Sequence, residues 1–183
     1  MKLDILFVNP GNSGVIYQGL ADKYSAVETP TWALLLSESV RSKGFVPAIL
    51  DVNAERLSLS QCVEKVKAAE VRLICFVVYG QNPNSGTVNM SGAVELANAL
   101  KVNDVNQPIC AVGSHVSALP LDVLRAELCF DFVLCNEGVY ALHNILNLDF
   151  IDSRSLQEIR GLGIRINGEV VLTEPERVVP QNR

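Results

Sequence analysis

The sequence lacks any long hydrophobic run, any basic stripe and any secretory signal, and each absence excludes a class of protein. The longest fully apolar run, Leu73 to Tyr79, is far too short to span a bilayer, and Met1 leads directly into a strand-like segment. The 183 residues carry a net charge of −5, so nucleic acid and anionic membrane are poor partners. We therefore expect a cytoplasmic protein with no membrane span and no nucleic-acid partner.

Closely spaced cysteines are also missing. An iron–sulfur cluster or a zinc site needs thiolates a few residues apart, and the five cysteines of this chain are scattered. Reduced thiols packed as small hydrophobic groups are the favoured interpretation, and they suit a cytoplasmic protein. No metal ligand is therefore expected among Cys62, Cys75, Cys110, Cys129 and Cys135.

What the chain does have is a regular alternation of strand and helix signals. Hydrophobic residues make up 49% of the sequence and charged residues 19%, which is typical of a globular domain. Apolar runs predict strands at residues 3–8, 48–52, 72–78, 108–112 and 132–134. Helical periodicity and cap residues predict helices beginning at residues 29–30, 58–60, about 90, 119–120 and 139, with a polar loop between residues 79 and 89.

This alternation predicts an α/β fold. Five βα units imply a doubly wound, parallel, five-stranded sheet of the flavodoxin-like, Rossmann-type three-layer kind, with strand order 2-1-3-4-5. After residue 150 the pattern changes, and Asn167-Gly168 predicts the type I′ turn of a C-terminal β-hairpin. We expect a Rossmann-like domain at residues 1–150, followed at 151–183 by the hairpin and a linker.

Ligands of such folds bind at the carboxyl ends of the strands, which places four loops at the site. The first, after residue 9, lacks the glycine fingerprints of nucleotide binders, so an ordinary long turn is favoured over a phosphate cradle. The loops after residues 79 and 113 are rich in amides, hydroxyls and glycine, which suits a neutral, amide-rich ligand, although a solvated loop is the alternative.

The chain has two histidines. His115 is expected to donate or accept a hydrogen bond rather than to catalyse, and His143 is expected to be structural.

Two further side chains leave alternatives open. Glu137, next to a helix start, either holds ribose hydroxyls or caps the helix. Trp32 either belongs to the core of the first helix, which is the favoured interpretation, or faces a partner domain.

Several short segments in a fixed order resemble one known family. They are Asn9-Pro10, Glu28-Thr29-Pro30-Thr31-Trp32, Gly44, Asp51-Val52-Asn53-Ala54-Glu55, Asn82-Pro83-Asn84-Ser85, Gly113-Ser114-His115-Val116-Ser117-Ala118-Leu119-Pro120 and Asn136-Glu137-Gly138-Val139-Tyr140-Ala141-Leu142. Together they resemble the N-terminal cobalamin-binding domain of cobalamin-dependent radical S-adenosylmethionine enzymes, over residues 1 to 173. The resemblance implies that residues 1–150 are the cobalamin-binding domain.

The resemblance also implies where the corrinoid lies. Its nucleotide tail is expected in a slot beside the third- and fourth-strand loops, where small residues leave room, while amides and hydroxyls meet the propionamide arms of the corrin. No catalytic residue is implied. The implied cofactor-binding residues are Asn9, Pro10, Tyr79, Gly80, Gln81, Asn82, Asn84, Ser85, Thr87, Gly113, Ser114, His115, Ser117, Asn136, Glu137 and Gly138.

The sequence departs from related proteins in two ways. Residues 9–17 contain no histidine, so the Asp-x-His-x-x-Gly motif of cobalamin carriers is absent and binding without a histidine lower ligand is expected. The Cys-x-x-x-Cys-x-x-Cys motif is absent too, so the iron–sulfur cluster and S-adenosylmethionine are expected only on a domain absent from this chain. The partner implied is a radical S-adenosylmethionine catalytic domain, downstream or on a separate chain.

The sequence therefore predicts a corrinoid-binding module, non-catalytic alone, of a radical S-adenosylmethionine methyltransferase or related enzyme. We expect either a fragment of a larger enzyme or a free-standing module. Two alternatives remain: a flavin- or nucleotide-binding flavodoxin-like domain, and a protein-interaction module without a ligand.

Overall fold

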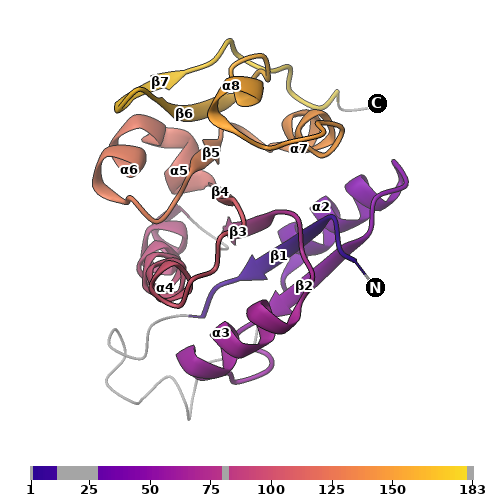
Figure 1. The fold of residues 1–183 in the computed structure, drawn as a ribbon, viewed down its shortest axis with the longest axis vertical. Helices are drawn as coiled ribbons and strands as arrows, with labels where there is room; N and C mark the ends of the chain where they lie inside the picture. The colour runs from indigo at the N-terminus through magenta and orange to yellow at the C-terminus, as the bar shows by residue number, and fades with distance from the viewer. Residues whose placement is uncertain (1, 12–28, 80–82, 181–183) are drawn as a thin grey trace.

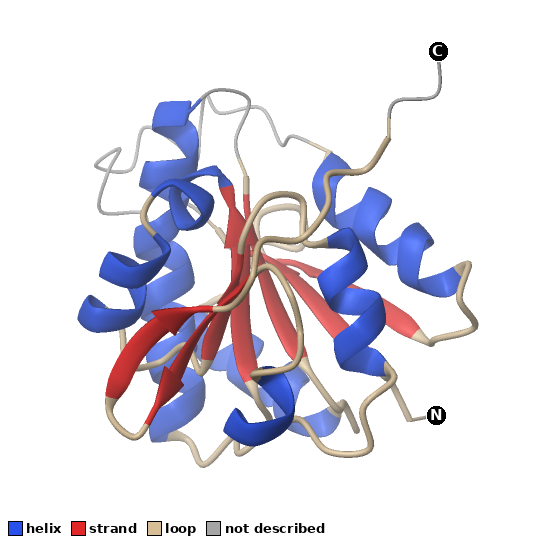
Figure 2. Ribbon diagram, turned by 90° about the horizontal axis from the view of Figure 1, so that it is seen from above, coloured by secondary structure: helices blue, strands red, loops and turns tan. Residues whose placement is uncertain are grey.

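The computed structural model describes residues 2–11, 29–79 and 83–180, with the backbone alone for 83–88. A single sheet runs through the molecule, with helices on both faces (Figure 1, Figure 2). Its strands lie in the order β2-β1-β3-β4-β5-β6-β7. The elements are β1 (Ile5–Asn9), α2 (Thr31–Arg41), β2 (Pro47–Asp51), α3 (Leu59–Ala68), β3 (Ile74–Val78), α4 (Pro83–Val102), β4 (Ile109–Gly113), α5 (Ser114–Ala118), α6 (Pro120–Ala126), β5 (Phe132–Leu134), α7 (Val139–Leu146), α8 (Ser153–Leu156), β6 (Leu162–Ile166) and β7 (Glu169–Leu172).

The predicted strand order 2-1-3-4-5 is confirmed, but the sheet has two more strands than predicted. The first five strands are parallel, and the C-terminal hairpin adds β6 and β7 antiparallel beside β5. β6 pairs with β5 because its apolar residues Leu162 and Ile164 are buried there, which also covers an otherwise open sheet edge. The hairpin turn is as predicted, with Asn167 and Gly168 at φ of 50° and 87°.

Two apolar cores lie on opposite faces of the sheet. One is formed with α2, α7 and α8, and the other with α3, α4, α5 and α6. Every residue of β3 and β4 is buried, so successive side chains of these strands enter the two cores alternately. Ile74 and Phe76 belong to one core, and Cys75 and Val77 to the other. This burial on both faces is the reason for the continuous apolar runs in the sequence.

Two segments predicted as loops are largely helical. The chain from Pro83 onward belongs to α4, so the predicted loop to residue 89 is wrong over most of its length. Proline fits the first turn of a helix, where its missing N–H is not needed, so Pro83 is itself a signal for the start of α4. The predicted loop after Gly113 is the short helix α5.

The favoured interpretation of Trp32 as a core residue is wrong. The buried face of α2 is formed by Ala33, Leu36, Ser37 and Val40, and the Trp32 side chain is 40% exposed. The buried face of α2 therefore begins one residue after Trp32, and the tryptophan side chain lies outside this face. Trp32 lies instead near the carboxyl end of the sheet, where its ring contacts another aromatic side chain.

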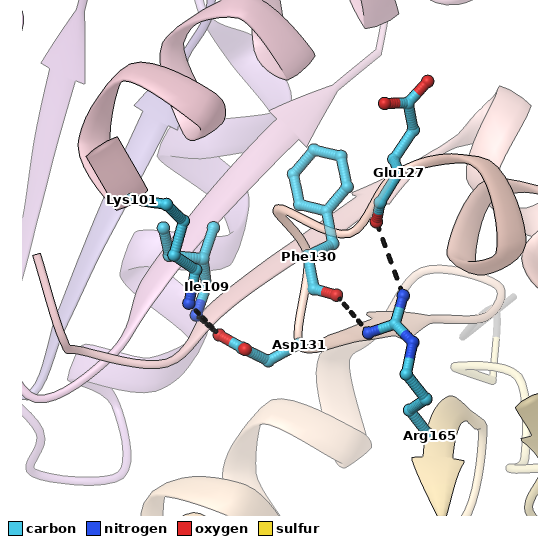
Figure 3. A network of polar contacts seen from close by, with 6 residues as sticks. All are labelled: Lys101, Ile109, Glu127, Phe130, Asp131 and Arg165. Carbon is cyan, nitrogen blue, oxygen red and sulfur yellow. Dashed lines mark hydrogen bonds and ion pairs between the residues drawn. The ribbon is translucent and has the colours of Figure 1, made fainter. Parts of the chain in front are cut away.

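Polar clamps hold the opposite, amino edge of the sheet together (Figure 3). The Asp131 carboxylate accepts hydrogen bonds from the Ile109 N–H at 2.7 Å and from the Lys101 ammonium at 2.8 Å. The Arg165 guanidinium on β6 donates to the Phe130 carbonyl at 2.9 Å, to the Leu124 carbonyl and, at 3.5 Å, to the Glu127 carbonyl. The first clamp aligns β4 with β5, and the second ties the hairpin to the end of α6.

A histidine–serine hydrogen bond between α7 and α2 predicts a pH dependence of stability. His143 Nε2 and Ser39 Oγ are 3.0 Å apart, and burial lowers the His143 pKa below its usual value of 6.5. As the pH falls, the unfolded chain therefore takes up a proton on His143 before the folded chain does. The contribution of His143 to the free energy of unfolding is then fully present above pH 6.5 and decreases below it. We expect His143→Gln to remove most of this decline in urea titrations between about pH 5 and 7.5. Equal pH slopes for the two proteins would contradict a half-buried His143 that is neutral in the folded state.

Candidate functional site at the carboxyl edge

The ends of β1 and β2 are joined by a buried carboxylate. Asn9 Nδ2 donates to Asp51 Oδ1 at 3.1 Å, and the same oxygen accepts the Ala54 N–H at 3.1 Å. Asp51 is only 8% exposed, and Pro10 is also buried. The predicted site residues Asn9 and Pro10 are thus brought to the carboxyl edge, but the Asn9 amide is already engaged in holding β2. Asp51 was not predicted as a site residue, although its place at a strand end was a usable signal.

Tyr79 follows β3 and reaches over the end of the sheet. Its hydroxyl donates to the Asn136 carbonyl at 3.2 Å, and its ring stacks on Trp32 with centroids 4.4 Å apart and planes 20° from parallel. Burial, and next the negative charge of Glu137, raise the pKa of Tyr79 to about 12. The phenol is therefore a neutral hydrogen-bond donor at physiological pH.

Gly113 lets β4 end in tight contact with β3. A Cβ atom at this position would lie 2.1 Å from the Val78 carbonyl oxygen and 2.6 Å from its carbon. The glycine is in extended backbone geometry, so close approach and not an unusual φ requires it. The residues that follow, Ser114 and His115, lie half-buried on α5.

The Asn136 carbonyl is the point where three strand ends meet. It accepts hydrogen bonds from Tyr79 Oη and from Ser117 Oγ, each at 3.2 Å. Asn136 itself is exposed and left-handed, with φ of 56°, a conformation that asparagine tolerates better than most residues. The segments that follow β3, β4 and β5 are thus joined through one backbone oxygen.

Gly138 begins α7 in a left-handed conformation, with φ of 70°. A Cβ atom there would lie 3.1 Å from the Leu134 side chain and 3.2 Å from that of Val112. Gly138 is the N-cap of α7, and within the described part of the chain no side-chain hydrogen bond caps this helix, so the structure does not show Glu137 in the capping role. The half-buried Glu137 carboxylate instead lies close enough to Tyr79 for its negative charge to raise the pKa of the tyrosine hydroxyl.

The structure brings together most of the predicted residues that it describes. Around the ends of β3, β4 and β5 lie Tyr79, Gly113, Ser114, His115, Ser117, Asn136, Glu137 and Gly138. The backbone of Asn84, Ser85 and Thr87 lies in the first turns of α4. Gly80, Gln81 and Asn82 lie outside the described residues. Sequence reasoning missed Trp32, whose contact with Tyr79 joins α2 to this group.

Among residues 2–11, 29–79 and 83–180, no group of three or more histidine, cysteine or acidic side chains is placed to hold a metal ion. The edge instead offers small residues, hydroxyls, a carbonyl and an aromatic pair. Such a lining suits an organic group that makes hydrogen bonds and stacking contacts.

A comparison with protein families identifies the chain. The B12 binding domain family matches residues 17–146, which is more than half of the sequence. The chain belongs to this family. The comparison with curated proteins found no match.

Solved structures with the same fold include a larger enzyme that was determined with cobalamin bound. The radical S-adenosylmethionine methyltransferase TsrM from Kitasatospora setae, with tryptophan substrate and a S-adenosylmethionine analogue bound, is 14% identical, with a TM-score of 0.71 over 93% of this chain. A second TsrM structure, with cobalamin and a [4Fe-4S] cluster bound, is 14% identical and gives 0.70 over 99% of this chain. The present chain spans only 30% of the length of either TsrM chain. In the part of the present chain that the structure describes, every helix is too short or too polar to span a bilayer.

Proposed function

We propose that this chain is the cobalamin-binding module of a radical S-adenosylmethionine enzyme, a methyltransferase or a related enzyme. The observation that carries the proposal is the B12 binding domain match over residues 17–146, which includes the strand ends β3, β4 and β5. The fold shared with TsrM supports the same class of enzyme. When bound, cobalamin supplies a cobalt centre that can carry and transfer an organic group.

The residues at the carboxyl edge fit such a cofactor. Gly113 and Gly138 are buried, and they let the segments that bear the predicted binding residues pack closely, because a Cβ atom would lie 2.1 Å from the Val78 carbonyl oxygen or 3.1 Å from the Leu134 side chain. Ser114 and Ser117 add hydroxyls and little bulk. The amide-rich arms of a corrin can form hydrogen bonds with these groups and with the neutral phenol of Tyr79. The residues that would hold the cofactor are those of the predicted set, with Asn9 and Pro10 at the end of β1.

The cobalt is held without a histidine lower ligand in this proposal. Residues 9–17 contain no histidine, and His143 lies on α7 facing Ser39. The iron–sulfur cluster and S-adenosylmethionine belong to a catalytic domain, downstream or on a separate chain, to which residues 151–183 lead. The five thiols, all free, suit a cytoplasmic enzyme.

Retention of a coloured cofactor tests the proposal. We expect the protein, mixed with hydroxocobalamin, to keep about one equivalent of red chromophore after gel filtration, and to be stabilised by it in thermal melts. Ser117→Phe fills the edge between α5 and Asn136 and should weaken binding at least about tenfold. The exposed Ser153→Phe on α8 is the matched control. A colourless protein, or stabilisation by flavin mononucleotide in place of cobalamin, would refute the assignment.

A further inference from the structure

Tyr79 is a large side chain among residues that include Gly113, Ser114, Ser117 and Gly138 around the ends of β3, β4 and β5. Its hydroxyl bonds to the Asn136 carbonyl, which follows β5, while β4 lies between the two strands in the sheet. The bond therefore spans the end of β4, above Gly113 and the start of α5. This is the part of the edge where the proposed function places the nucleotide tail.

The Tyr79 ring packs against the core formed with α2 and α7, whereas its hydroxyl is held by a contact that can be exchanged. A hydrogen bond to an exposed residue holds the hydroxyl, and a stacked ring, that of the 40% exposed Trp32, covers a face. The Asn136 carbonyl keeps its second donor, Ser117 Oγ, when the phenol leaves. Opening the bridge, by which we mean the hydrogen bond between Tyr79 and Asn136, therefore leaves this carbonyl with a donor, so no buried acceptor is left without a partner.

We propose that Tyr79 determines which corrinoids the module accepts, because its bridge to Asn136 occupies the slot that a nucleotide tail must enter. Corrinoids with a tail bind only after the phenol has left Asn136. Corrinoids without a tail bind over the closed bridge. This inference rests on the proposed function.

The test compares cobalamin with cobinamide, a corrinoid that lacks the nucleotide tail. The quantity measured is the ratio of the two dissociation constants, obtained by absorbance titration of the same protein. Tyr79→Ser removes the ring and should shift the ratio in favour of cobalamin by about tenfold. Tyr79→Phe removes only the hydroxyl and should shift it by about fivefold, the effect of one hydrogen bond.

The control is Phe150→Ser, which removes a 78% exposed aromatic side chain beyond the far end of α7 and should leave the ratio unchanged. Thermal melts show whether each variant is folded. An unchanged ratio of dissociation constants in both Tyr79 variants, or a shift of the ratio towards cobinamide, would overturn the role of Tyr79. The proposed function would still stand in that case if the wild type bound cobalamin. Failure of the wild type and of folded Tyr79→Ser to bind either corrinoid would overturn the proposed function itself.

Discussion

Gly113→Ala is expected to destabilise the protein by about 4 kcal/mol, the largest effect of any single methyl group that the structure suggests. The added Cβ would lie 2.1 Å from the Val78 carbonyl oxygen, so β3 and β4 would have to separate at their buried ends. Both strands are fully buried, and their displacement would disturb both cores. Urea unfolding measures the loss directly, and thermal melts should show a decrease of about 8–16 °C.

Gly44→Ala is the matched control for this substitution. Gly44 has a φ of 89°, and among the described residues no heavy atom lies within 4 Å of the place where a Cβ would stand. Its replacement therefore adds backbone strain without a collision, and we expect a loss of about 1–2 kcal/mol there. A loss at Gly113 no greater than at Gly44 would show that β4 can move away from Val78 at little cost.

Arg165→Met is expected to lower the free energy of unfolding by about 3 kcal/mol. The substitution keeps much of the aliphatic length but removes the donors that bind the Phe130 and Glu127 carbonyls (Figure 3) and the Leu124 carbonyl. These carbonyls lose a charged partner, and the hairpin loses its connection to the end of α6. Amide hydrogen exchange should therefore quicken across β6 and β7 before it does so in β3 and β4.

Arg125→Met on α6 provides the comparison. Its guanidinium makes a surface ion pair with Asp122 at 3.2 Å and its side chain is 58% exposed, so we expect a change within about 0.5 kcal/mol. Arg165→Lys should recover only part of the stability, because a single ammonium cannot reach three separate carbonyls. Equal effects of Arg165→Met and Arg125→Met would mean that the clamp contributes no more than a surface charge.

The sequence predicted the parallel part of the fold because each buried element carries its own signal. The strand at residues 132–134 and the helix at 139–146 lie where periodicity and flanking residues placed them. Asn167-Gly168 defined the hairpin turn by chemistry alone. That the hairpin joins the main sheet depends on contacts between β6 and β5, which no local pattern of residues encodes.

The candidate site was predictable as a set of strand ends but not as a set of contacts. Topology brings Gly113, Ser117 and Gly138 to one edge, so their grouping followed from the strand order. The Tyr79–Asn136 bond and the Trp32–Tyr79 stack depend on side-chain directions and on a left-handed backbone at Asn136. The sequence therefore predicted an open slot, whereas in the structure a tyrosine bridges it.

The central claim is that cobalamin binds at the carboxyl ends of β3, β4 and β5. Nuclear magnetic resonance of the ¹⁵N-labelled protein, titrated with diamagnetic hydroxocobalamin, tests it most directly. We predict that backbone amide signals of residues 113–117 and 135–139 shift, while those of residues 72–74, 106, 107 and 109 at the amino edge do not. Shifts confined to the amino edge, or unchanged spectra at saturating cobalamin, would contradict the account.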